Sequence, residues 1–80
     1  MVQLRDVRRI AGFTQVELAA RLGVTQSRVS QLERADLQRL EVGTVLGYLA
    51  ALGADLELAV DVTGERVVLA AERGGGASGG

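Results

Sequence analysis

Polar side chains able to hydrogen-bond to nucleic acid gather on one face of a short predicted helix at residues 25–33. Thr25 can cap the N-terminus of this helix, and Val24 and Val29 can pack together as a hydrophobic staple. At 3.6 residues per turn, Val29 and Leu32 point to one side. The opposite side and its flanks carry Gln26, Ser27, Arg28, Ser30, Gln31 and Arg34. Amides, hydroxyls and guanidiniums bond to base edges and phosphates in a DNA major groove, although a solvated helix face would have the same pattern.

The residues before this helix predict a second helix joined to it by a tight turn. Thr14 and Glu17 have the spacing of a capping box, and Phe13 and Leu18 have that of a hydrophobic staple. Gly23 supplies the left-handed conformation that lets one helix follow another at once. A helix, a turn containing glycine and a second helix with a polar outer face make a helix-turn-helix unit.

One motif in this unit resembles a known family. The motif is Thr14-Gln15-x-Glu17-Leu18-Ala19-x-x-Leu22-Gly23-Val24-Thr25-Gln26-Ser27-x-Val29-Ser30-x-Leu32-Glu33. In its spacing it closely resembles the Xre/Cro-type helix-turn-helix of phage repressors and bacterial antitoxins. The resemblance extends over residues 2 to about 53, two thirds of the chain.

The resemblance implies roles for individual residues. By analogy with the family, Gln15 contacts a phosphate and supports Gln26. Base contacts come from the positions of Gln26, Ser27 and Gln31. Arg8 and Glu33 match a family ion pair, and the helical wheel agrees with a structural role because Glu33 lies off the polar face.

The chain departs from the family pattern after the second helix of the unit. Ala35 stands where the family usually has glycine. A left-handed helix exit would cost roughly 1 kcal/mol with alanine, so the helix either accepts that strain or leaves differently. The loop at 35–40 also differs from the commonest family patterns, and Arg39 is its candidate phosphate contact.

Two further helices are predicted, one on each side of this unit. The first covers residues 2–11 and ends at Gly12, and its inward positions are Leu4, Val7 and Ala11, with Ile10 beside them. The other covers residues 41–52 and ends at Gly53, and its inward positions are Val42, Val45, Leu46 and Leu49. Gly43 and Gly47 share one face of this last helix, where they either allow a close helix approach or are tolerated surface positions.

From Asp55 the apolar period changes from 3.6 to 2, which predicts a β-hairpin. Thr63-Gly64 is the turn signal, and residues 66–70 form the second strand. A two-residue turn pairs Val62 with Glu65, Asp61 with Arg66, Val60 with Val67 and Leu58 with Leu69. Because an isolated hairpin is marginally stable in water, its apolar face must pack on the helices or its strands must pair with another chain.

Antitoxins of the HigA and HipB type look similar over residues 49 to 62, with Leu-Gly-x-x-Leu-x-Leu followed by a strand. In HipB-like members this strand joins that of a second subunit. The resemblance therefore implies a homodimer. The dimerisation residues would be Leu56, Leu58, Val60, Val62, Val67 and Leu69.

Length and composition exclude several classes of protein. Eighty residues make one folded unit, with a helix-turn-helix region at 1–53, a hairpin at 54–71 and a flexible glycine-rich tail at 72–80. The chain has no cysteine and no histidine, so we expect no disulfide, no metal, no cofactor and no enzymatic activity. No run of 18 apolar residues and no signal peptide is present, which predicts a cytoplasmic protein without membrane contact.

Charge is distributed unevenly along the chain. Residues 1–53 carry seven arginines and five acids, a net charge of +2. Residues 54–80 carry two arginines and five acids, a net charge of −3. This asymmetry orients the helical part toward a polyanion.

We therefore expect a mainly α fold of four to five helices followed by a dimerising β-hairpin. The expected function is a sequence-specific DNA-binding repressor that binds a palindromic operator as a homodimer. It would be the antitoxin of a type II toxin–antitoxin system that represses its own operon, with a cognate toxin as a further partner. A stand-alone phage-like regulator and a protein-interaction module without DNA binding are the alternatives.

Overall fold

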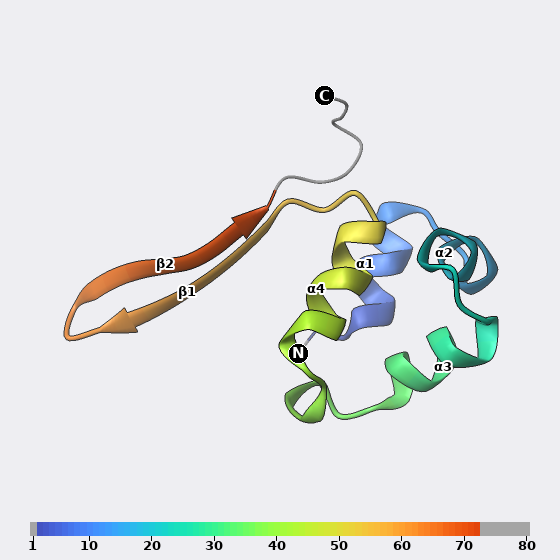
Figure 1. Cartoon of the computed structure of the whole chain (residues 1–80), viewed down its shortest axis with the longest axis horizontal. Helices are drawn as coiled ribbons and strands as arrows, with labels where there is room; N and C mark the ends of the chain where they lie inside the picture. The colour runs from blue at the N-terminus through green and yellow to red at the C-terminus, as the bar shows by residue number, and fades with distance from the viewer. Residues whose placement is uncertain (1, 73–80) are drawn as a thin grey trace.

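The chain folds into a group of helices followed by an antiparallel two-stranded hairpin (Figure 1). This computed structural model describes residues 2–72. The elements in order are α1 (Leu4–Ala11), α2 (Gln15–Leu22), α3 (Gln26–Arg34), the 3-10 turn η1 (Leu37–Arg39), α4 (Val42–Ala51), β1 (Leu56–Val62) and β2 (Glu65–Glu72). The predicted fold class is confirmed. Of the tail expected at 72–80, Glu72 ends β2 and the remainder lies outside the described residues.

Capping side chains set where α2 and α3 begin. Thr14 N donates to Glu17 Oε1 at 2.8 Å, and Glu17 N donates to Thr14 Oγ1 at 3.1 Å. Arg28 N donates to Thr25 Oγ1 at 3.1 Å. Between the two helices, Gly23 has a φ of 71°. Because these bonds satisfy backbone groups that a helix end leaves unpaired, both helices start at the residues that the sequence marks.

The exit from α3 avoids the left-handed conformation. Ala35 has φ −72° and ψ 154°, an extended conformation that alanine adopts without strain. Asp36 then caps η1, because its Oδ1 accepts from Gln38 N at 3.1 Å. Of the two exits left open by the sequence, the chain takes the unstrained one.

The core lies among the four helices and is almost entirely aliphatic. Its buried hydrophobic residues are Leu4, Leu18, Ala19, Val29, Leu32, Tyr48 and Leu52. Tyr48 is the largest of them and is only 1% exposed. It sits on α4, where the stripe predicted as wholly aliphatic has this aromatic ring at its centre.

Three predicted inward positions are exposed. Ile10 is 83% exposed because the buried stripe of α1 runs through Leu4 and Arg8, and Ile10 points away from it. Ala11 is in line with that stripe, but it lies in the last turn, beyond the core. Val42 is 56% exposed because it opens α4 ahead of the turns that pack on the other helices.

The two glycines of α4 are surface positions. Gly43 and Gly47 are both exposed, and a Cβ built on either would have no described atom within 4 Å. They therefore do not serve a close helix approach within the described part of the chain.

The hairpin turns through two residues in left-handed conformations. Thr63 has φ 48° and Gly64 has φ 83°, as in a type I′ turn, which matches the twist of the strands. The predicted pairs Val62–Glu65, Asp61–Arg66 and Val60–Val67 are present. The side chain of Arg66 bonds diagonally, with Nη2 2.7 Å from Glu57 Oε1.

The predicted pairing of Leu58 with Leu69 is wrong. The register shifts between Leu58 and Ala59, so that Ala59 pairs with Val68 and Leu58 pairs with Ala70. Leu69 is the extra residue of this bulge. A bulge breaks the strict two-residue alternation on which the predicted register depended, and it leaves no strong mark in the sequence.

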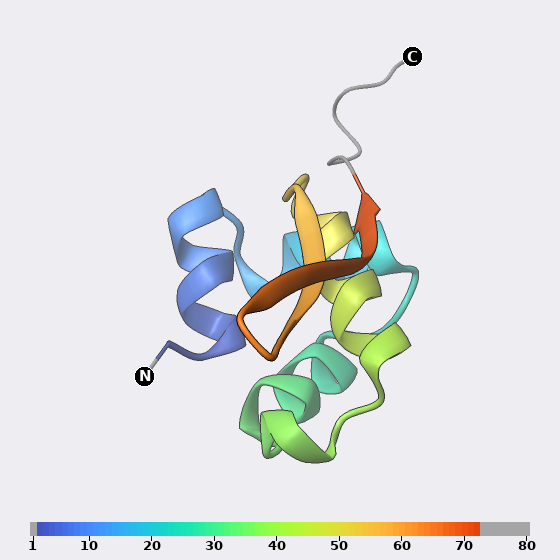
Figure 2. The same cartoon turned by 90° about the vertical axis from the view of Figure 1, so that its left-hand side faces the viewer.

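The hairpin extends away from the helices as a long arm (Figure 1). Figure 2 is turned by 90°, so that the arm projects toward the viewer. Every residue of β2 is exposed, and the exposed aliphatic residues of the two strands include Leu58, Val60, Val62, Val67, Val68 and Leu69. Among residues 2–72, no helix has the length and hydrophobicity needed to cross a membrane.

Candidate nucleic-acid interface

Helix α3 is held by two buried aliphatic residues and presents a polar face. Val29 is 0% exposed and Leu32 is 6% exposed. The predicted reading residues Gln26, Ser27, Arg28, Gln31 and Arg34 are exposed, and Ser30 is half-buried. Arg34 lies along its own helix, because its Nη1 donates to Ser30 Oγ at 2.9 Å. The face can therefore meet a groove without disturbing the core.

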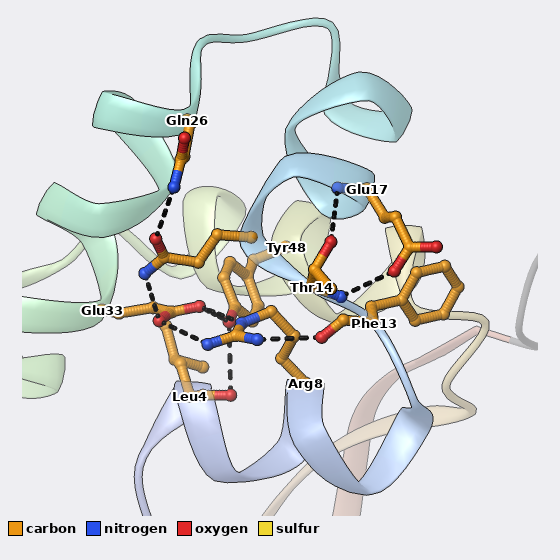
Figure 3. A network of polar contacts seen from close by, with 9 residues as sticks. Leu4, Arg8, Phe13, Thr14, Glu17, Gln26, Glu33 and Tyr48 are labelled. Atoms are coloured by element: carbon orange, nitrogen blue, oxygen red, sulfur yellow. Dashed lines mark hydrogen bonds and ion pairs between the residues drawn. The ribbon is translucent and has the colours of Figure 1, made fainter.

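A buried carboxylate lies behind this face. Glu33 accepts two hydrogen bonds from Arg8, at 2.6 Å from Nε to Oε2 and at 3.1 Å from Nη2 to Oε1. Their side chains are 4% and 9% exposed, respectively. Arg8 also donates from Nη1 to the carbonyl of Phe13 at 2.8 Å, which ties the α1–α2 turn to the pair. The two residues that the family pattern matches are thus in contact, and they join α1 to α3 (Figure 3).

Tyr48 completes the environment of this carboxylate, and the sequence interpretation did not identify it. Its hydroxyl donates to Glu33 Oε2 at 2.6 Å and lies 3.3 Å from the carbonyl oxygen of Leu4. Burial and the bond to the carboxylate raise the pKa of Tyr48 well above its ordinary value, so it remains a donor. The available signal was the single tyrosine of the chain, which falls within the predicted helix at 41–52, since a buried phenol needs a hydrogen-bond partner.

Glu33 stays ionised despite its burial. Burial raises the pKa of its carboxyl, but hydrogen bonds from Arg8, Tyr48 and Gln15 outweigh that effect and lower the pKa to about 2. The pair is therefore charged and saturated with donors over the whole physiological range.

Two glutamines connect the carboxylate to the exposed face. Gln15 Nε2 donates to Glu33 Oε1 at 3.0 Å, and Gln26 Nε2 donates to Gln15 Oε1 at 3.3 Å. The bonds run from the core, through the start of α2, to the start of α3 (Figure 3). Gln15 and Gln26, which the family pattern links, are thus brought together.

Arg39 lies apart from this group. Its side chain is 87% exposed, on η1, and its Nε is 3.8 Å from Asp36 Oδ2. The geometry thus gathers Gln15 and the α3 residues around one helix, with Arg39 on a separate turn after it.

Comparison with known proteins agrees with this arrangement. A family model described as a helix-turn-helix domain matches residues 1–61. The chain belongs to this helix-turn-helix family. The predicted membership is therefore confirmed, and the match includes the network around Glu33 and most of β1.

Relatives of this helix-turn-helix protein include two from Mycobacterium tuberculosis that are named as antitoxins, HigA3 and HigA2. The first is 42% identical over 67 residues, which are 82% of this chain and 61% of the relative. The second is 38% identical over 68 residues, which are 85% of this chain and 67% of the relative. The chain thus spans about three fifths of the first relative.

Two solved structures are similar to this helix-turn-helix protein along most of their length. One, described as DNA-bound antitoxin HigA3, has a TM-score of 0.82 at 38% identity and covers 91% of this chain and 95% of that one. The other, described as induced DNA bending by unique dimerization of HigA antitoxin, has a TM-score of 0.77 at 40% identity. It covers 84% of this chain and 90% of that one.

Proposed function

We propose that the protein is a homodimeric, sequence-specific DNA-binding repressor. It acts as the antitoxin of a type II toxin–antitoxin pair and represses its own operon in the cytoplasm. The observation that carries the proposal is the face of α3, where exposed amides, hydroxyls and guanidiniums stand on a helix fixed by Val29 and Leu32. The similar structure of DNA-bound HigA3 supports it.

On this proposal, the residues of the face have separate tasks. Gln26, Ser27 and Gln31 read base edges, where an amide can bond to adenine in two places. Gln15, Arg28, Ser30, Arg34 and Arg39 contact the backbone. Phosphate contacts set the position of the helix, and base contacts set the preferred sequence.

The exposed hairpin supplies the dimer interface in this proposal. One helix-turn-helix reads only a short half-site, and a second copy about 34 Å away along the DNA doubles the sequence that is read. The strands expose aliphatic side chains and open edges, which proteins usually cover or pair. Because the segment after residue 53 is acidic, pairing there also holds it away from the phosphates.

Selection of duplexes from a randomised pool tests the function. We expect enrichment of a palindromic sequence and binding that weakens steeply with salt. Absence of any enriched sequence would reject DNA recognition and favour the protein-interaction module. The neighbouring gene tests the narrower proposal, since an antitoxin requires a toxin reading frame beside it and a stand-alone regulator does not.

A further inference from the structure

We infer that Tyr48 is a positioning residue for base recognition. It helps to fix the orientation of the side-chain amides of Gln15 and Gln26, which are hydrogen-bonded to each other, and so determines which polar groups Gln26 offers to DNA. The inference rests on the proposed function and adds a residue that lies on α4, outside the helix-turn-helix unit itself.

The carboxylate of Glu33 has four hydrogen-bond donors around it. Oε2 accepts from Arg8 Nε and from the Tyr48 hydroxyl, each at 2.6 Å. Oε1 accepts from Arg8 Nη2 at 3.1 Å and from Gln15 Nε2 at 3.0 Å. An ionised carboxylate offers about four lone-pair positions. Arg8 and Tyr48 together therefore hold both oxygens in place and leave Gln15 one position on Oε1.

This arrangement fixes the polarity of the next two side chains. An ionised carboxylate can only accept, so Gln15 must turn its NH2 group toward Glu33. The carbonyl oxygen of Gln15 then faces Gln26, so Gln26 must donate a hydrogen bond from its own NH2 group, with Nε2 3.3 Å from Gln15 Oε1. Gln26 is exposed and is left with its carbonyl oxygen and one N–H for the groove. The donor–acceptor pattern offered to a base thus follows from the buried carboxylate.

Tyr48 matters because Arg8 alone leaves one position on Oε2 unfilled. Without the hydroxyl, the carboxylate can turn to satisfy that oxygen elsewhere, and Oε1 then leaves the position that orients Gln15. A buried carboxylate oxygen that lacks a hydrogen-bond donor is costly in free energy. Rotation of the Glu33 carboxylate is therefore favoured over the geometry seen in the wild-type chain. The effect reaches Gln26 through the amide of Gln15.

Tyr48→Phe tests the inference, because it keeps the buried ring and removes only the hydroxyl. Leu52→Val is the matched control: it shortens another buried side chain just after α4, and Leu52 carries no polar side-chain atom. Nitrogen-15 spectra of the full-length chain, recorded below the melting temperature of every variant, should show the side-chain NH2 signals of Gln15 and Gln26 shifted in Tyr48→Phe. Those signals should be unchanged in Leu52→Val.

The second measurement uses the duplex selected by the wild-type chain and its single-base variants. In Tyr48→Phe, we expect discrimination at the base read by Gln26 to fall roughly tenfold, the scale of one lost two-point contact. In Gln15→Met, discrimination at this base should fall by a similar factor. The double variant with Tyr48→Phe should lose little more, because both substitutions interrupt the same series of hydrogen bonds.

Unmoved amide signals would overturn the inference, as would base discrimination in Tyr48→Phe equal to that of Leu52→Val. If the wild-type chain selects no duplex, the proposed function fails instead. In that case the amide signals alone decide whether Tyr48 orients the two glutamines.

Discussion

The hydroxyl of Tyr48 on α4 donates to Glu33 on α3 at 2.6 Å, and the two residues lie on either side of the α3–α4 connection. Since Glu33 also bonds to Arg8 of α1 and Gln15 of α2, one carboxylate touches all four helices. Its ionisation therefore affects the whole helical body.

Acid should destabilise the protein through Glu33. Its pKa is lowered from the ordinary value of 4.5 to about 2 in the folded chain. A lowered pKa contributes stability above the unfolded value, and that contribution is lost as the pH falls from about 4.5 toward 2. Urea unfolding measured from pH 6 to pH 2 should show this loss in the wild type and a flatter profile in Glu33→Gln. Equal slopes in both proteins would exclude the carboxyl as the source.

The Arg8–Glu33 pair should couple strongly in a double-mutant cycle. Removing either partner leaves a buried group without its bonds, so Arg8→Ala and Glu33→Ala should each cost about 3–5 kcal/mol. The double variant should lose clearly less than the sum of the two. Chemical denaturation at neutral pH supplies the four free energies. Additive losses would show that the contact contributes nothing of its own.

Gln31→Ala should separate base reading from general affinity. It should cost about 1–3 kcal/mol on the selected duplex and relax the choice at one base pair, while binding to random DNA changes little. Arg28→Ala should instead weaken binding to every duplex and reduce the salt slope by about one unit. Fluorescence anisotropy at several salt concentrations measures both. If Gln31→Ala weakens specific and random binding equally, Gln31 does not read a base.

Gly47→Ala should stabilise the helical body by about 1 kcal/mol, because the glycine lies inside α4 and an added Cβ meets no described atom. Gly53→Ala provides the contrast, since Gly53 has a φ of 79° and alanine is strained there. Thermal melts should therefore move in opposite directions. A destabilised Gly47→Ala would indicate that something covers this face in solution.

Deleting residues 54–80 should convert the proposed dimer into a monomer and leave helical circular dichroism largely intact, because the buried core residues lie on the helices and just after α4. Binding to a palindromic duplex should weaken. Light scattering at micromolar concentration gives the mass. A truncated chain that still dimerises would move the interface to the helices, where Ile10 and Val42 are exposed.

The starts of α2 and α3 and the register next to the hairpin turn were predictable because their signals are local, whereas α1 begins at Leu4 and not at residue 2. Thr14, Thr25 and Gly23 act within a few residues of themselves, and a two-residue turn fixes the first three strand pairs.

The role of Tyr48 was not predictable from such signals, because its partner Glu33 comes from another helix. Ile10 was placed inward since a wheel shows which residues share a face but not which face the other helices cover. The bulge at Leu69 was not predictable, because the alternating residue types of the two strands indicate an unbroken ladder.

The bulge at Leu69 also affects how many copies of the chain can pair through their strand edges. A hairpin has two open edges, and an arm that paired through both would add copies without end. A bulge bends its strand and breaks the evenly spaced ladder that a further strand needs. Because the edge of β2 is interrupted in this way, we expect copies to pair along β1 alone. Two β1 strands related by a two-fold axis form a closed dimer to which no third copy can add. On this expectation, the irregular strand would limit the exposed aliphatic arm to pairs of chains and disfavour filaments.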